Sequence, residues 1–297
     1  MKKKTEKEEG FISSVFLDPL TDFGFKKIFL DKDLLSAFLS DVAGIHIRDI
    51  QYQSTEGLGE SVEERKVIFD LYCTTDTGEH VIVEMQVGKQ NQFTDRALFY
   101  ASHAIRKQAP RKKYWNYELK AVYVVSILDF IIFKEEEAKS IVVERASLYR
   151  EQAKKHYSGK LSLVFIELPK FTKTVKELGT NTDRWLYLLR HLSELEDYPP
   201  EITGKVFKKF LETAQIKNLT PTEMETYSKS LSKNFYVRNI AECARMEGRE
   251  EGDTKGRMEE RKLIAVKLIE RKTPVEEIMF LTNLTKEQIQ ELAKENS

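Results

Sequence analysis

The chain has 297 residues, and its 48 Lys and Arg residues balance its 48 Asp and Glu residues, so the formal net charge is zero. This length allows a substantial hydrophobic core, while the zero charge neither supports nor excludes nucleic-acid binding, which local patches can provide. Two cysteines without metal-ligand spacing, Cys73 and Cys243, exclude a disulfide scaffold and indicate a reducing, cytoplasmic setting, and no apolar run is long enough for a membrane span.

The first fifty residues are predicted to be mainly helical. Residues 1–14 lack the apolar core of a secretory signal and are expected to form a disordered leader. Asp18 and Pro19 suit the cap and first turn of a short helix that ends at Phe29. A strand is expected near residues 47–54. Between them, an amphipathic helix is predicted for residues 31–42, with the apolar residues Leu34, Leu35, Phe38 and Leu39 on one side.

Residues 69–86, FDLYCTTDTGEHVIVEMQ, are the most informative part of the chain. They predict a β-hairpin with strands Lys66–Thr74 and Glu79–Val87, because both segments are rich in β-branched and aromatic residues. Phe69 and Leu71 fall in one row of the first strand. The residues between the strands, Asp76-Thr77-Gly78, fit a three-residue loop with Gly78 in the left-handed conformation.

This turn sets the register of the hairpin. Thr75 pairs with Glu79, so Asp70 falls opposite Glu84, and Gln86 shares the face of Glu84 because side chains alternate along a strand. Directly opposed acids destabilise a sheet unless a cation binds them. Mg²⁺ is commonly held by one or two carboxylates with phosphate and water. The hairpin therefore predicts either a metal site or a solvated edge hairpin with ordinary surface acids.

The rest of the chain predicts a mixed α/β sheet of five or six strands with helices, followed by a helical region. A helix is expected at residues 93–107, and Arg96, Tyr100, His103 and Lys107 share one face of it. The expected strands are residues 119–128, 140–148 and 161–168, and the expected later helices are residues 183–195, 201–216 and 221–237. Thr220 and Glu223 form the expected cap of the last of these helices.

A basic segment follows the helix of residues 93–107. Sequence-independent phosphate contacts are the favoured role of its charges, and a polar loop around Pro110 is the alternative; the charged residues are Arg106, Lys107, Arg111, Lys112 and Lys113. Trp115 and Tyr117 are expected to pack as anchors of the next strand rather than to stack on bases.

The C-terminal region is predicted to be a charged tail. One long helix is expected for residues 237–271, and residues 273–292 predict a helix-turn-helix-like end in which Thr273 and Thr285 cap the two helices. The acids of the last helix suit phosphate binding poorly. A self-associating or partner-binding tail is therefore at least as consistent with the sequence as a DNA reader.

Several segments in chain order resemble the PD-(D/E)xK nuclease superfamily and, within it, the recombination-promoting nuclease / putative transposase family of bacteria. The resemblance rests on LDPLTDFGFKKIF, ERKVIFDLYCTTDTGEHVIVEMQ, WNYELKAVYVVSILDF, LSLVFIELPKF, DRWLYLLRHL and EGREEGDTKGRMEE. It implies a restriction-endonuclease-like mixed sheet flanked by helices, with a nuclease-like core at residues 15–172, a helical extension at residues 173–236 and the tail at residues 237–297.

The same resemblance implies roles for the hairpin residues. Asp70, Glu84 and the Met85 carbonyl would hold the metal, and Gln86 stands where the superfamily usually has lysine. Glutamine is neutral and a very poor base, which leaves more of the chemistry to the metal, while Lys26 or Lys89 can supply the missing charge. Asp22 is either an extra metal ligand or a residue at the start of a helix.

The leading hypothesis is a Mg²⁺-dependent DNA endonuclease, with Mn²⁺ as an alternative ion, that promotes recombination or acts on mobile or foreign DNA. Asp70, Glu84 and Gln86 would be catalytic, and Arg96, Tyr100 and the basic segment would contact DNA. The rival hypothesis is a catalytically weak DNA-binding or assembly protein that retains the nuclease fold. We also expect the chain to self-associate through the C-terminal tail and not to bind membranes.

Overall fold

The computed structural model describes residues 14–54, 56–57, 67–110 and 114–295. The chain divides into two compact units, one up to Arg238 and one from Asn239 onward. The predicted leader, apart from Ser14, and the basic residues Arg111, Lys112 and Lys113 lie outside the described residues. No helix in the described ranges has the length and apolar character that crossing a membrane requires.

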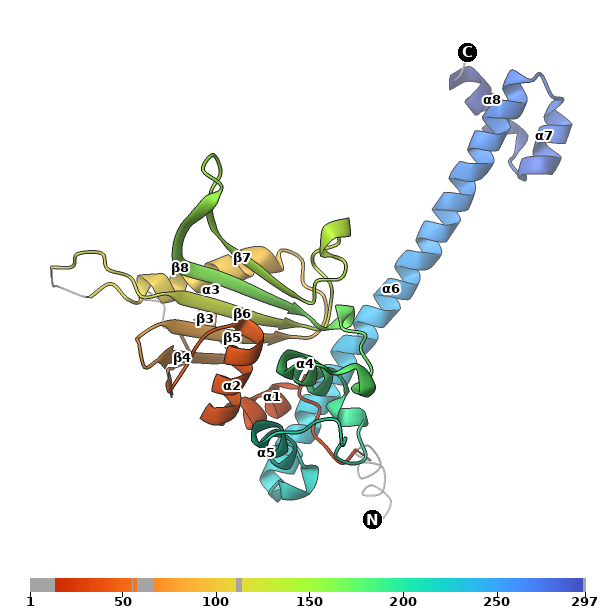
Figure 1. Ribbon diagram of the computed structural model, residues 1–297. Helices are drawn as coiled ribbons and strands as arrows, with labels where there is room; N and C mark the ends of the chain where they lie inside the picture. The colour runs from red at the N-terminus through yellow and green to blue at the C-terminus, as the bar shows by residue number, and fades with distance from the viewer. Residues whose placement is uncertain (1–13, 55, 58–66, 111–113, 296–297) are drawn as a thin grey trace, which may run out of the picture. The chain divides into compact units, whose positions relative to one another are not determined.

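A six-stranded mixed sheet forms the centre of the first unit (Figure 1). Its order is β1-β4-β5-β6-β8-β7; β5, β6 and β8 run parallel, and the remaining neighbours are antiparallel. The strands are β1 (Ile50–Tyr52), β4 (Leu71–Thr75), β5 (His80–Gln86), β6 (Val122–Leu128), β7 (Val143–Arg150) and β8 (Lys155–Glu167), and a separate pair is formed by β2 (Glu56–Gly57) and β3 (Val67–Ile68). The mixed sheet confirms the predicted α/β class.

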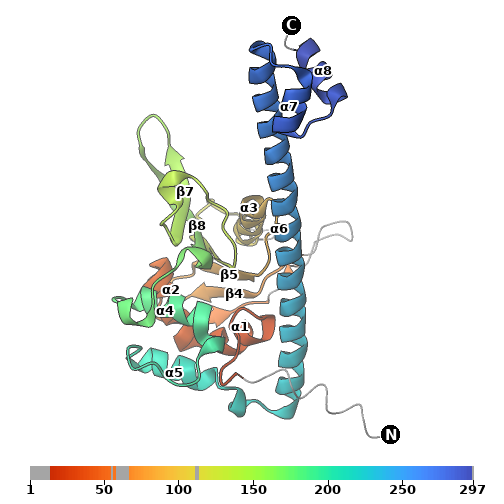
Figure 2. The same cartoon turned by 90° about the vertical axis from the view of Figure 1, so that its right-hand side faces the viewer.

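Helices cover both faces of this sheet (Figure 2). Helix α3 (Phe93–Arg106) packs on one face, with Ala97, Ala101 and Ala104 against the strands. The other face carries α1 (Asp22–Phe29), α2 (Lys32–Ala43), α4 (Asn181–His191) and α5 (Lys205–Thr213). The predicted helical extension thus shares one hydrophobic cluster with the predicted nuclease-like core.

The apolar residues of α2 account for this packing. Leu34, Leu35, Phe38 and Leu39 are all fully buried, which confirms the predicted apolar side. Asp31 caps the helix by accepting hydrogen bonds from two backbone N–H groups, and Gly44 ends it in the left-handed conformation at φ +62°. Trp185 of α4 contacts Phe38 edge to face at 5.7 Å, so residues far apart in sequence share this cluster.

The hairpin register agrees with the prediction, but its first strand does not. Leu71 pairs with Val83 and Thr74 with His80, as a three-residue turn with Gly78 at φ +84° requires. The predicted single strand Lys66–Thr74 is wrong, because the chain breaks between β3 and β4 at Phe69 and Asp70. Phe69 leaves the row of Leu71 and packs edge to face on Tyr100 of α3 at 5.1 Å.

Several predicted helix boundaries also differ; for example, the helix predicted at residues 201–216 is shorter, α5. The first helix begins at Asp22 with Thr21 as its cap, because Asp18 uses its carboxylate and carbonyl oxygens to close a turn instead. Residues 221–270 form one continuous helix, α6 (Pro221–Glu270), that starts at the predicted Thr220 cap. Thr273 does not cap α7 (Val275–Thr282), which follows Pro274 directly.

The second unit has a small core of its own. The end of α6 packs against α7 and α8 (Lys286–Glu295) through Ala265, Ile278, Leu284 and Ile289. Thr285 and Gln288 exchange hydrogen bonds at the start of α8, which confirms the predicted capping box. Short 3₁₀ helices complete the chain: η2 (Glu136–Ala138), η3 (Leu168–Lys170), η4 (Val175–Glu177), η5 (Leu192–Glu194) and η6 (Ile216–Asn218).

Candidate active site

The break in the first hairpin strand creates the candidate site. In a continuous ladder, the backbone N–H of Met85 would pair with the carbonyl of residue 69. The chain has turned away there, and the Asp70 Oδ2 atom accepts this N–H instead at 2.8 Å. The Asp70 N–H in turn donates to Oε1 of Glu84 at 3.2 Å. These two bonds hold both carboxylates at the end of β5.

Glu84 is a buried acid beside another acid. Its exposed fraction is 3%, and burial, reinforced by the charge of Asp70, raises its pKa to about 8. Burial also raises the pKa of Asp70, although the hydrogen bond from Met85 opposes that shift. The raised pKa values mean that the two carboxylates resist being ionised at the same time, because too little positive charge surrounds them. A bound cation would supply that charge.

Arg96 of α3 is a positive group in contact with one of these acids, Glu84. Its guanidinium donates to Oε2 of Glu84 at 3.4 Å and to Oε1 of Gln86 at 3.2 Å. It also donates to Gln90 at 2.6 Å and to the Tyr100 hydroxyl at 2.7 Å. The structure therefore brings together Arg96, Tyr100, Glu84 and Gln86, and the guanidinium faces the acids rather than solvent alone.

Helix α1 brings a second charged pair into electrostatic range. Lys26 lowers the pKa of both Asp70 and Glu84, while Asp22 raises that of Asp70. Lys26 and Asp22 form an ion pair with each other at 2.7 Å. Among the described residues no group of three or more His, Cys, Asp or Glu side chains is arranged to hold a metal ion. The ligand role of Asp22 and that of the Met85 carbonyl stay predictions.

Two residues of this site were not identified from sequence. Ser126 of β6 is in register with Glu84, and its buried Oγ has no hydrogen-bond partner in the described structure. In the strand VYVVSIL, Ser126 stands alone among apolar and aromatic residues, and this is the only sequence feature that could have identified it. Gln90 contacts Arg96 from the segment between β5 and α3, and nothing in its local sequence marks it.

The remaining candidates lie elsewhere. The Lys107 Nζ atom lies 4.7 Å from the centroid of the Tyr72 ring. The Tyr72 hydroxyl forms a hydrogen bond with His80, which lies at the opposite end of β5 from Glu84. Arg106 precedes it at the end of α3. Tyr117 is 79% exposed with φ +61°, so its predicted packing role is wrong; it contacts only the neighbouring Trp115 among the described rings.

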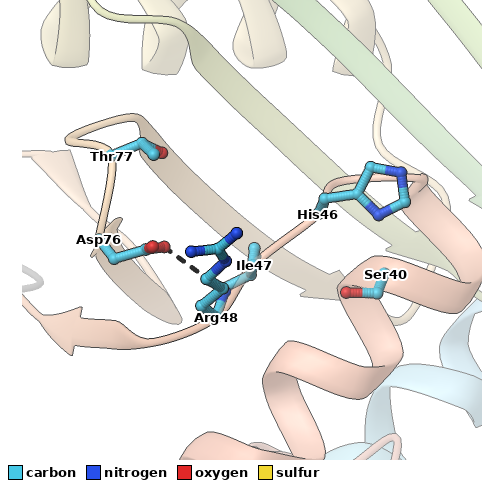
Figure 3. Close-up of a pocket in the computed structure, with 6 residues that line it drawn as sticks. All are labelled: Ser40, His46, Ile47, Arg48, Asp76 and Thr77. Carbon is cyan, nitrogen blue, oxygen red and sulfur yellow. Dashed lines mark hydrogen bonds between the residues drawn. The ribbon is translucent and has the colours of Figure 1, made fainter.

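A surface pocket lies at the turn end of the hairpin, away from the acids. Its volume is about 510 Å³. The backbone N–H of Arg48 donates to Oδ1 of Asp76 at 3.4 Å, and the dashed line in Figure 3 marks this hydrogen bond. The residues that line it are Ser40, His46, Ile47, Arg48, Asp76 and Thr77. None of them belongs to the site around Glu84, so this pocket is not part of the candidate active site.

The Arg96 network is expected to contribute to stability. Arg96→Met should lower the free energy of unfolding by roughly 1–3 kcal/mol, because it removes the partner of a buried carboxylate. Urea unfolding in a chelator measures this effect. The matched control is Arg150→Met, since Arg150 is exposed and makes no ion pair within the described residues. Equal stability of the two variants would show that the Arg96 contacts are not formed in solution.

Comparison with known proteins places the first unit in a family. The family model described as PD-(D/E)XK nuclease family transposase matches residues 19–242, which include Asp70, Glu84 and Gln86. No match is found among curated proteins or among solved structures. The six-stranded mixed sheet with flanking helices agrees with the restriction-endonuclease-like fold. Since the match covers more than half of the sequence, the chain belongs to the PD-(D/E)XK nuclease family transposases.

Proposed function

We propose that this protein is a divalent-metal-dependent DNA endonuclease whose active site is built on Asp70 and Glu84. The observation that supports this most directly is the pair of acids at the strand break, where burial and mutual repulsion raise the pKa of Glu84 to about 8. The family membership implies a nuclease that acts on DNA and uses divalent metal.

The residues present fit a hard divalent cation. Asp70 and Glu84 supply oxygen ligands, which Mg²⁺ and Mn²⁺ prefer, and backbone hydrogen bonds already orient both carboxylates. When bound, the ion would neutralise the acids, position a phosphate and assist deprotonation of the attacking water. We favour Mg²⁺, with Mn²⁺ as the alternative.

The chain's own residues would do the remaining work. Gln86 bonds to Arg96 through Oε1 and to the Val87 carbonyl through Nε2, so its amide is held in one orientation beside the acids. We propose that it orients the attacking water rather than deprotonating it. Arg96 and Lys26 would supply the positive charge that lysine provides in other members of the superfamily.

The test is incubation of supercoiled plasmid with the full chain in Mg²⁺, in Mn²⁺ and in chelator. Metal-dependent nicking or linearisation is expected. A preparation that binds DNA but leaves the plasmid intact in both metals would contradict the proposal. It would favour the alternative, a catalytically weak DNA-binding or assembly protein, for which the neutral Gln86 at the lysine position is the supporting observation.

Recombination or action on mobile DNA is the setting that the transposase description suggests, and a strand-transfer assay tests it. The two free thiols, Cys73 and Cys243, support a reducing compartment, which we propose to be the cytoplasm.

We also propose that the second unit mediates self-association. Phe280 is 87% exposed and its neighbour Leu281 is 56% exposed, on a unit with a small core. Light scattering should show more than one chain per particle at micromolar concentration, and Phe280→Ser/Leu281→Ser should shift the mass to one chain. A monomeric wild type at these concentrations would rule out this role. Phe235→Ser, at an exposed phenylalanine of the first unit, is the control.

A further inference from the structure

A second feature of the sheet lies far from the acids. Strands β7 and β8 extend past their neighbours as a two-stranded ribbon, defined here as residues 147–160 (Figure 1). Strand β6 begins to pair with β8 only at Leu161, so the ribbon has no third strand among the described residues. An isolated two-stranded hairpin is marginally stable in water by itself.

The ribbon concentrates positive charge. It contains four basic residues and one acid, Glu151; the basic residues are Arg150, Lys154, Lys155 and Lys160. All four are exposed, and none forms an ion pair with a carboxylate in the described part of the chain. This contrasts with the whole chain, whose formal charge is zero.

The arrangement at the ribbon's tip is electrostatically unfavourable on its own. Arg150 and Lys155 are directly paired across the two strands, and like charges in that position destabilise a hairpin. The tip is nevertheless ordered by specific contacts: the Tyr149 hydroxyl donates to the Lys154 carbonyl at 2.7 Å, and the Tyr149 and His156 rings meet at 5.0 Å. An anion bound between the two cations would relieve their repulsion.

The exposed rings add to this surface. Tyr149 is 54% exposed and Tyr157 is 70% exposed. At the base of the ribbon, Lys120 and Lys160 line a pocket of about 380 Å³ together with the acid Glu79, so the excess of positive charge lies along the ribbon rather than at its base. Two strands about 5 Å apart fit into or across a DNA groove, and the major groove is about 12 Å wide.

From these observations we propose that residues 147–160 form a DNA-binding arm that contacts the phosphates of duplex DNA without sequence preference. The proposal rests on the proposed function for the choice of DNA as the partner. Phosphate is the anion that four unpaired cations on a two-stranded ribbon fit, and the tyrosines would pack against the sugar-phosphate backbone.

The position of the arm defines its role. Glu84 is in register with Ser126 and Phe165, and Lys155 precedes Phe165 by ten residues on β8. At about 3.3 Å per residue this is roughly 30 Å, close to one turn of B-form DNA. The arm therefore holds the duplex at a distance from the acids and does not touch the bond to be cleaved.

The test measures binding separately from cleavage. Fluorescence anisotropy of a labelled 30-base-pair duplex is recorded with the full chain in chelator, across a series of salt concentrations. Arg150→Gln/Lys154→Gln/Lys155→Gln should weaken binding at least about tenfold at physiological salt and reduce the slope of log K against log[salt] by about two to three, since each lost phosphate contact contributes about 0.9. The charge-preserving pair Arg150→Lys/Lys155→Arg should bind like wild type.

The matched control removes three charges elsewhere in the first unit. Lys176→Gln/Lys205→Gln/Lys217→Gln alters exposed lysines of the helical face and should leave affinity and slope within twofold of wild type. Because all substituted residues are exposed, and because neutralising Arg150 and Lys155 removes a repulsion, the unfolding midpoints should not fall. The arm assignment is overturned if the ribbon variant binds like wild type, if the control loses as much affinity, or if wild type prefers duplex RNA or binds no DNA.

This design separates the two proposals. Ribbon-dependent binding without plasmid cleavage in either metal would support the arm and reject the nuclease activity. Metal-dependent cleavage with ribbon-independent binding would support the nuclease activity and reject the arm.

Discussion

Asp70→Asn is expected to reduce metal-dependent plasmid cleavage by at least about a hundredfold. Substituting residues that merely orient metal ligands already costs about 10–100-fold, and this substitution removes a charged ligand itself. Asparagine keeps the size of the side chain and can still accept the Met85 N–H, so the strand break should persist. The loss would therefore reflect the missing charge rather than a local collapse.

The control for this result uses the same substitution at the other end of the hairpin. Asp76→Asn lies in the turn, where its carboxylate accepts only the Arg48 N–H at 3.4 Å among the bonds described. It should cleave within twofold of wild type. Titration of Mn²⁺ into each protein without DNA gives a second readout, and only Asp70→Asn should lose binding. Cleavage by Asp70→Asn within threefold of wild type would place the active site elsewhere.

Glu84→Gln is expected to stabilise the metal-free protein at pH 8 and to remove a pH dependence. The pKa of Glu84 is raised to about 8 in the folded protein from an ordinary value of 4.5. Between these pH values the folded state holds a proton that the unfolded state has released, so the stability of the wild type falls as pH rises from about 4.5 to 8. Below pH 4.5, Glu84 is protonated in both the folded and the unfolded state and does not change the free energy of unfolding. Above pH 8 it is ionised in both states, and the loss of stability is complete.

A proton that only the folded state binds changes the free energy of unfolding by about 1.36 kcal/mol per pH unit. Because Asp70 and Glu84 titrate as a coupled pair, we expect a smaller total, roughly 3 kcal/mol between pH 4.5 and pH 8. Denaturant unfolding in chelator at pH 5 to 9 measures it. Glu84→Gln should give a flatter profile, while Glu137→Gln, at an exposed position, should follow the wild type. Parallel profiles for wild type and Glu84→Gln would show that Glu84 is ionised normally.

Divalent metal should stabilise the folded state, whereas ionisation of Glu84 destabilises it in the metal-free protein. A cation that binds the ionised carboxylates favours the folded state, and its stabilising effect should grow between pH 6 and pH 8 as fewer protons compete for the site. In Glu84→Gln the stabilisation by metal should be weak at both pH values. This pattern distinguishes binding at the acids from general salt effects, which would stabilise both proteins equally.

Local sequence chemistry determined the hairpin and its register. The three residues Asp76-Thr77-Gly78 specify the loop length, and a loop of that length aligns Thr75 with Glu79 and therefore Asp70 with Glu84. The buried side of α2 and the capping boxes at Thr220 and Thr285 were likewise readable, because each depends on residues within one or two turns.

Long-range packing, which local sequence patterns do not specify, brings these residues together as a site. The break at Phe69 and Asp70 arises where Phe69 packs on Tyr100 of α3, a contact between segments that local patterns do not connect. The same long-range packing buries Glu84 and places Arg96 and Lys26 in electrostatic range. The ribbon of residues 147–160 was missed because its polar, charged residues have no hydrophobic period. Turns and caps are set by neighbours in sequence, whereas burial and charge pairing are set by neighbours in space.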